Sequence, residues 1–335
     1  MALREIQREK PGLRFLYLTA IFLGVWGTDC VAEGPGEKSE KEGKAQKQVI
    51  PVPDFELLKA RSHAEHRELG GRAPYFAHYR KGELELVFIA ARHELRMGSP
   101  THRLIESVIN GFAPACVITE GLGSEEGFSP RGLLRDARRR KPGGNLPEPL
   151  YAALLAAKKG IPFIGGEPPP SVTAQALRAE GSEEDVLGFL VVRHLGQVRR
   201  EEPEAELDQK VRRMLPRMKE RFALKTEMRL DDFKAWYQKT SGRAFLAANI
   251  DPEAVAPLAT RNAGLMRRMG IAVMLARERH LISLEARLLG EYRRVLVIYG
   301  SGHLVYEHAI LKEMLGPPMR KSSRWIDQGT QRVPG

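Results

Sequence analysis

The hydrophobic pattern of the chain contains four short apolar runs, and a histidine or a glutamate follows each of them. The runs are Leu84–Ala90 before His93, Ala115–Thr119 before Glu120, Ile161–Ile164 before Glu167, and Val295–Tyr299 before His303. Short apolar runs that alternate with helix-like stretches are typical of buried parallel strands. The sequence therefore predicts an α/β fold with a mainly parallel β-sheet flanked by helices.

The four polar residues that follow these runs share a predicted position. In open α/β sheets, ligands bind outside the carboxyl ends of the strands, where His93, Glu120, Glu167 and His303 are expected. Two imidazoles and two carboxylates at one edge have the chemistry to hold a metal ion or to carry out acid–base catalysis. This edge is the predicted functional site.

Helix signals separate the first three runs. A hairpin turn at Lys81-Gly82 is expected to join Tyr75–Tyr79 to the first run. Ser99-Pro100 is a good N-cap and first-turn pair for a helix over Thr101–Gly111. A second helix is predicted over Pro147–Lys159, ending at Gly160.

The pattern changes after the third run. Pro168, Pro169 and Pro170 are predicted to end regular structure, and residues 171–249 have the amphipathic spacing of a helical insertion that could cap the site. Another helix is predicted from Asp251-Pro252 to about Leu289, with a candidate break at Gly270. The last run leads through His303 into a helix that ends near Leu315.

The termini differ in composition from the region between them. Basic residues precede an apolar stretch of about thirteen residues, Phe15–Gly27, which is signal-peptide length and too short for an ordinary membrane span. Residues 1–32 are therefore predicted to be an export signal, with an uncleaved anchor or lipidation at Cys30 as alternatives. The Gly-, Glu- and Lys-rich residues 33–49 are predicted to be a flexible linker, 50–316 the α/β domain, and 317–335 a flexible tail. The protein is expected to be exported, in the periplasm, associated with the envelope, or secreted.

Composition adds two exclusions. The formal net charge is +11, but the basic residues are spread along helices among glutamates, and aromatic residues make up only 7% of the chain, so no specific nucleic-acid partner is predicted. The chain has two cysteines, Cys30 and Cys116, so no disulfide framework is expected, and Cys116 is predicted to be a small core residue.

Common catalytic signatures do not match the chain. His93-Glu94-Leu95-Arg96-Met97 begins like a zincin motif but has Met97 where the second histidine belongs. No G-x-S-x-G elbow of a serine hydrolase and no phosphate-binding loop occurs.

The remaining motifs resemble those of the TraB/PrgY–GumN–TIKI superfamily, to which the erythromycin esterase-like and ChaN-like proteins are more distantly related. The matching segments, in family order, are Phe88–His93 with Ser99-Pro100, Val117–Gly121, Gly160–Glu167, Thr260-Arg261-Asn262 and Val297–Leu304. They cover most of the region from about Tyr75 to Leu315. One departure is that Ala90 and Ala91 occupy the places of the family's glycine and threonine, so the local turn is expected to differ.

The resemblance implies a hydrolytic or metal-binding site at the strand ends. His93, Glu120, Glu167 and His303 would bind a divalent Mn, Co, Zn or Fe ion and form the catalytic core. Arg261 would hold a substrate carboxylate or stabilise an oxyanion. Without metal, a histidine could act as general base beside a glutamate.

We therefore expect an exported, metal-assisted hydrolase of a peptide, ester or amide bond, with a peptide or a small molecule as substrate. Two alternatives remain open. One is a haem- or iron-binding envelope protein, which would need a histidine or tyrosine on an open apolar surface. The other is a catalytically silent relative that serves only in binding, and the loss of glycine at Ala90 favours it most. Membrane contact is expected only through the N-terminal segment.

Overall fold

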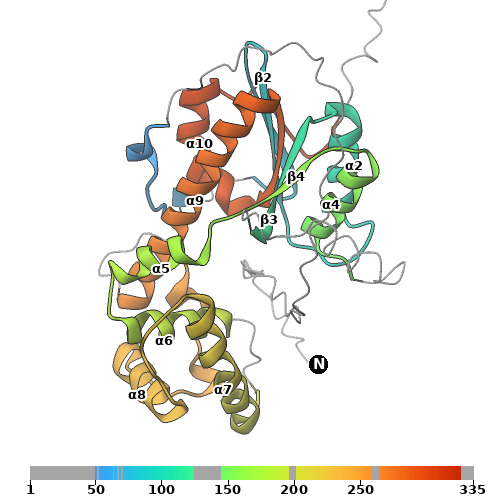
Figure 1. Ribbon diagram of the computed structural model, residues 1–335. Coiled ribbons are helices and arrows are strands. Elements are labelled where there is room, and N and C mark those ends of the chain that lie inside the picture. The colour runs from blue at the N-terminus through green and yellow to red at the C-terminus, as the bar shows by residue number, and fades with distance from the viewer. Residues whose placement is uncertain are drawn as a thin grey trace, which may run out of the picture.

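The described part of the chain is a three-layer α/β unit joined to a helical unit (Figure 1). The computed structural model describes residues 50, 53–62, 64–65, 68, 71–123, 145–195, 201–257 and 264–325. The predicted export signal (1–32) and linker (33–49) lie outside these residues, as do 326–335 of the predicted tail.

A six-stranded sheet forms the middle layer, in the order β4-β3-β5-β2-β1-β6. The strands are β1 (Tyr75–Lys81), β2 (Leu84–Ala91), β3 (Cys116–Gly123), β4 (Phe163–Glu167), β5 (Arg294–Gly300) and β6 (Arg320–Ser322). The neighbours β4, β3, β5 and β2 run parallel, whereas β1 is antiparallel to β2 and to β6. The predicted α/β class with a mainly parallel sheet is confirmed.

Both faces of the sheet are covered by helices. On β5, Val295 and Val297 pack towards α9 (Leu265–Tyr292) and α10 (Ser301–Leu315), whereas Leu296 and Ile298 pack towards α2 (Pro100–Phe112) and α4 (Glu148–Lys158). Burial on both faces explains why the central strands read as continuous apolar runs.

The helices on the α2/α4 face begin as predicted. Ser99 caps α2 through its side chain, which accepts a hydrogen bond from the His102 N–H, and Pro100 occupies the first turn. The helix continues past the predicted end at Gly111 and closes at Ala113, which has a left-handed φ of 48°.

A helical unit follows β4 and lies beside one end of the three-layer unit (Figure 1). It comprises α5 (Pro170–Arg178), α6 (Glu183–His194), α7 (Glu204–Arg221) and α8 (Leu230–Ser241), which share one apolar core with the first turns of α9. The prediction that Pro168–Pro170 end regular structure is wrong, because α5 begins at Pro170 with Pro169 as its N-cap. Proline suits the first helical position, where no N–H partner is needed. Across the described residues, no helix is both long and apolar enough to cross a membrane.

The long helix α9 differs from the prediction at its start and at Gly270. Only a 3₁₀ turn, η3 (Pro252–Val255), forms near Asp251, and α9 runs from Leu265 without a break at Gly270. A Cβ atom at position 270 would lie 2.4 Å from the Val255 carbonyl oxygen. Gly270 is therefore a contact point at which η3 packs against α9.

Replacing Gly270 with alanine is expected to lower the free energy of unfolding by about 1–3 kcal/mol, because a backbone carbonyl cannot move aside as a flexible side chain can. Urea denaturation measures this change. Gly264→Ala is the matched control, since a Cβ there has nothing within 4 Å. Equal stabilities of the two variants would contradict the tight contact.

The tail is ordered beyond its predicted start. β6 pairs with the outer edge of β1, and Trp325 packs on Phe76 with ring centroids 5.0 Å apart. The first part of the predicted tail, as far as Trp325, thus packs on the α/β unit. Pairing covers an edge that would otherwise expose unpaired backbone groups.

Candidate functional site

The structure brings four of the five predicted site residues to one edge of the sheet. Glu120 lies in β3, Glu167 is the last residue of β4, His93 follows β2, and His303 lies in the first turn of α10 directly after β5. β4 starts and ends later than predicted, which makes Glu167 part of the strand. Arg261 lies outside the described residues.

Glu120 is the centre of this group. Its Oε2 accepts a hydrogen bond from the Gly300 N–H at 2.6 Å, and its Oε1 accepts one from Arg277 Nη2 at 3.1 Å. His303 Nε2 is 3.3 Å from Oε1, and His93 Nε2 is 3.8 Å from Oε2. The carboxylate therefore faces both imidazoles.

A buried glutamate holds the other ring nitrogen of each histidine. His93 Nδ1 pairs with Glu148 at the start of α4, and His303 Nδ1 lies 2.5 Å from Glu278 Oε1 on α9. Both glutamates are buried. A carboxylate at Nδ1 favours a proton there, which leaves Nε2 of a neutral imidazole as an acceptor.

A neutral imidazole would then point a lone pair at the Glu120 oxygens, which also carry lone pairs. This contact is favourable only if the imidazoles gain a proton at Nε2 or if a cation lies between the groups.

Arg277 joins the two strand-end carboxylates. Its Nε donates to Glu167 Oε2 at 2.8 Å and its Nη2 donates to Glu167 Oε1 at 2.6 Å, a two-point pairing, while Nη2 also reaches Glu120. Glu167 accepts a third hydrogen bond from the Gly121 N–H at 3.1 Å. The guanidinium thus neutralises charge that would otherwise be concentrated at this edge.

These contacts change the protonation of the central three groups. Burial opposes ionisation of Glu120, but the positive charges of His303 and His93 outweigh it and hold its pKa well below 4.5. Burial lowers the pKa of His303, but Glu278 and then Glu120 raise it to about 9. The pKa of His93 is raised for the same reason, since Glu120 and Glu148 outweigh burial.

The Arg277–Glu167 pair stays charged. Burial disfavours both ions, yet each outweighs that effect on its partner, so the pKa of Glu167 is lowered and that of Arg277 is raised. Burial, followed by the charge of Glu167, raises the pKa of the Tyr299 phenol well above 10, so this hydroxyl keeps its proton.

Close packing leaves no room for side chains at two glycines of the site. A Cβ at Gly166 would lie 2.2 Å from Tyr299 Oη, and a Cβ at Gly300 would lie 2.9 Å from His93 Nε2. The Tyr299 ring also meets the His303 ring edge-on at 4.9 Å. These glycines let the Tyr299 phenol and the His93 imidazole approach the strands closely.

The free energy of unfolding of the metal-free protein is expected to fall as the pH rises from about 6.5 to 9. The folded pKa of His303, about 9, exceeds its ordinary value of 6.5. Its contribution is therefore complete below pH 6.5 and is lost as the pH rises through 9, on the order of 3 kcal/mol in total. Urea denaturation in the presence of a chelator, beside His303→Gln, isolates this contribution. A stability difference between the two proteins that does not change with pH would contradict it.

Sequence reasoning missed three residues of the site, Arg277, Glu148 and Glu278. Arg277 and Glu278 are adjacent charged residues in the middle of α9, and Glu148 looks like an ordinary first-turn acid. The only sequence signal was charge at helix positions that face a buried sheet.

The turn after β2 was expected to differ from the family pattern. Ala90 and Ala91 in fact continue the strand, paired with Tyr299 and Gly300.

The donor set fits a divalent metal in its chemistry. Among the described residues, no group of three or more His, Cys, Asp or Glu side chains is placed so that it could hold a metal ion as it stands. However, His93 Nε2, His303 Nε2 and Glu120 converge, and a carboxylate holds each Nδ1, as is usual for metal-binding histidines. Glu167, which pairs with Arg277, is the least available of the predicted ligands.

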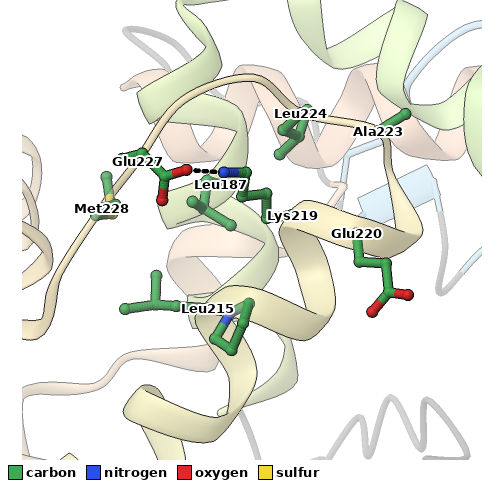
Figure 2. A pocket seen from close by; sticks show the side chains of 9 residues that line it. Leu187, Leu215, Lys219, Glu220, Ala223, Leu224, Glu227 and Met228 are labelled. Atoms are coloured by element: carbon green, nitrogen blue, oxygen red, sulfur yellow. Dashed lines mark hydrogen bonds and ion pairs between the residues drawn. The ribbon is translucent and has the colours of Figure 1, made fainter.

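A separate cavity of about 370 Å³ lies in the helical unit (Figure 2). Leu187, Leu215, Leu224 and Met228 form much of its apolar lining, and an ion pair between Lys219 and Glu227 crosses it. None of the residues that line it belongs to the strand-end group. Its charged lining residues include Lys219 and Glu227, which pair with each other, and no histidine or cysteine lines it, so we assign the chemistry to the sheet edge.

Comparison of the chain with protein-family models, with curated proteins and with solved structures found no match. The superfamily resemblance drawn from the motifs therefore stays a prediction, and the site is interpreted from its own geometry.

Proposed function

We propose that this protein is a metal-assisted hydrolase of a peptide, ester or amide bond. The observation that carries the proposal is the convergence of His93 Nε2 and His303 Nε2 on Glu120, with each Nδ1 held by a buried glutamate. This arrangement fixes both rings with the same nitrogen facing inwards. A structural hydrogen bond needs one histidine, whereas here two imidazoles present the same nitrogen to one carboxylate.

Each polar group at the edge has a distinct part in this proposal. His93, His303 and Glu120 would hold a divalent Mn, Co, Zn or Fe ion, and Glu148 and Glu278 would orient the two imidazoles. Such an ion, when bound, supplies a Lewis acid that polarises a carbonyl and lowers the pKa of water. Glu167 stays at the site as the partner of Arg277 and not as a ligand.

The chain also provides groups for the reacting carbonyl. Arg277 neutralises Glu120 and Glu167 and keeps both carboxylates in one orientation. Tyr299 carries a neutral hydroxyl at the same edge, and a neutral O–H can donate to an oxygen on which negative charge develops. A neutral hydroxyl donor beside these carboxylates and imidazoles suits hydrolysis at a carbonyl.

The cellular setting belongs to the same proposal. The apolar segment Phe15–Gly27 supports export, and the order of the motifs supports a relationship to the TraB/PrgY–GumN–TIKI superfamily. The substrate would be a peptide or a small molecule reached in the periplasm, at the envelope or outside the cell.

Haem binding is the alternative that a spectrum can test. Haem ligation needs a histidine or tyrosine on an open apolar surface, whereas His93 and His303 each lie against carboxylates, with side chains 19% and 9% exposed. The geometry supports the hydrolase better. A Soret band on addition of haem to the full chain, lost in a His303→Gln variant, would reverse this preference.

Elemental analysis of the purified full chain tests the proposal. We expect close to one Mn, Co, Zn or Fe ion per chain after reconstitution, and hydrolysis in a panel of peptide and ester substrates. A His93→Gln, His303→Gln double variant should lose both. His308→Gln, on the same helix as His303 but outside the group, is the matched control.

Circular dichroism establishes that all three proteins are folded. A folded wild type that takes up none of these metals would contradict the proposed metal site. Metal binding equal in the double variant and the wild type would place the ion elsewhere.

A further inference from the structure

Three buried glutamates lie behind His303, in the layer formed by α9 and α10. Glu278, Glu285 and Glu307 are each 0% exposed. Glu278 and Glu285 have heptad spacing on α9, and His303 and Glu307 have i, i+4 spacing on α10, so each pair lies on one face of its helix. The three buried carboxyl groups therefore form a row that extends from His303 into the core, and we call this row the file.

The contacts within this file leave oxygens without donors. Glu278 Oε1 faces His303 Nδ1, but no N–H or hydroxyl in the described chain donates to Glu278 Oε2 or to either oxygen of Glu285 and Glu307. Glu307 is within hydrogen-bonding reach of both Glu278 and Glu285. No Lys, Arg or His of the described residues forms an ion pair with Glu285 or Glu307.

Three ionised carboxylates in this setting would be very unfavourable, because each loses its hydration and repels the others. A carboxyl group that keeps its proton removes one charge and becomes a hydrogen-bond donor. Burial, then the charges of neighbouring glutamates, raises the pKa values of Glu285 and Glu307 well above 4.5.

On the β1 side, Tyr79 interacts electrostatically with Glu307 and Glu285 and carries no positive charge. It is fully buried, and its hydroxyl has no hydrogen-bond partner among the described residues. Tyr75 lies beyond it on the same strand. Protons within the file are thus the available means of neutralising it.

We propose that Glu307 is a positioning residue that acts in its protonated form, donating a hydrogen bond to Glu278 Oε2 and so fixing Glu278 as the acceptor for His303 Nδ1–H. Glu285, whose pKa is also raised, keeps its own proton and adds no charge to the file. The inference rests on the proposed function only in that His303 Nε2 is taken to face a metal.

The test uses the full chain with Co²⁺ as the probe, and compares Glu307→Gln with Glu307→Leu. The glutamine amide can still donate to Glu278, so its Co²⁺ affinity should stay within a few-fold of wild type. The leucine variant leaves Glu278 without that donor and should bind more weakly, by up to the roughly 10- to 100-fold that is typical when the direct partner of a metal-binding histidine is lost. Glu313→Gln, exposed on the same helix, is the control.

Two further readouts do not depend on metal. Infrared spectra at neutral pH should show a protonated carboxyl band that weakens in Glu307→Gln and not in Glu313→Gln. The folded pKa of Glu307 is raised, so its contribution to stability is complete below pH 4.5 and is lost as the pH rises. The stability of wild type relative to Glu307→Gln should therefore fall as the pH rises from 4.5 to 6.5.

The outcomes separate this inference from the proposed function. Equal Co²⁺ affinities in the leucine variant and wild type, or no loss of the carboxyl band in Glu307→Gln, would overturn it. A second bound Co²⁺ that disappears in Glu307→Gln would also overturn it, because a cation and not a proton would then neutralise the file. A wild type that binds no Co²⁺ refutes the proposed metal site. The infrared and pH measurements still test whether Glu307 is protonated, because they do not depend on metal.

Discussion

Glu120→Gln is expected to bind divalent metal at least about 100-fold more weakly than wild type and to lose hydrolytic activity. The reason is that Glu120 faces both imidazole Nε2 atoms, so its charge is part of the donor set itself. Loss of a residue that only orients a ligand typically costs 10- to 100-fold in affinity, and loss of a ligand should exceed that range. Titration with Co²⁺ measures the change.

Glutamine suits this experiment because it preserves the shape of the side chain. Its amide oxygen can still accept the hydrogen bond from Gly300 N–H, so the fold should be retained. Removing the negative charge should also lower the pKa values of His93 and His303, which nuclear magnetic resonance can follow. Glu106→Gln, on the exposed side of α2, is the control. Wild-type affinity in Glu120→Gln would mean that the ion binds elsewhere.

Arg277→Met is expected to lower the free energy of unfolding of the metal-free protein by about 3–5 kcal/mol at neutral pH. Arg277 is the shared counter-ion of Glu120 and Glu167, and removing one partner of a buried pair leaves an uncompensated charge. Urea denaturation in the presence of a chelator measures the loss. The chelator is needed because a bound cation would replace part of the missing charge.

Two further variants show whether charge or shape is responsible. Arg277→Lys keeps the charge but not the two-point pairing with Glu167, and should recover only part of the loss. Adding Glu167→Gln to Arg277→Met removes the uncompensated carboxylate and should restore stability relative to the single variant. An Arg277→Met protein within about 0.5 kcal/mol of wild type, the range of ordinary surface substitutions, would contradict the role of this pair.

The sheet could be predicted from the sequence because its physical signal is local. Strands buried on both faces must be apolar along their length, so Val295–Tyr299 and the other three apolar runs could be recognised as strands. The start of α9 and the role of Gly270 could not be predicted in this way. A glycine in a helical pattern suggests a break, and only the packing of Val255 against α9 shows why a glycine is needed there.

The candidate site was predicted in part for a similar reason. Residues that follow strands are ordered by the sheet, so His93, Glu120, Glu167 and His303 were expected at one edge, and the structure places them there. Their partners Arg277, Glu278 and Glu148 come from helices, and which helical charges face inwards depends on how the helices pack. The pattern of charge along α9 alone does not distinguish Glu278 from a solvent-exposed glutamate.

The β6 strand shows the same limit at the end of the chain. Residues 320–322 are short and polar, which is typical of a frayed tail. Their order depends on a partner far away in the sequence, the free edge of β1, and on the packing of Trp325 against Phe76. Pairing of this kind leaves no periodic signal in a segment so short.

The most direct measurement is anomalous diffraction from crystals of the full chain grown with Co²⁺, recorded above and below the cobalt absorption edge. The proposed function predicts one strong peak per chain, bounded by His93 Nε2, His303 Nε2 and Glu120, with Arg277 still paired to Glu167. A peak ligated by other residues, or His93, Glu120 and His303 ordered with no peak between them at saturating Co²⁺, would contradict the metal-assisted mechanism.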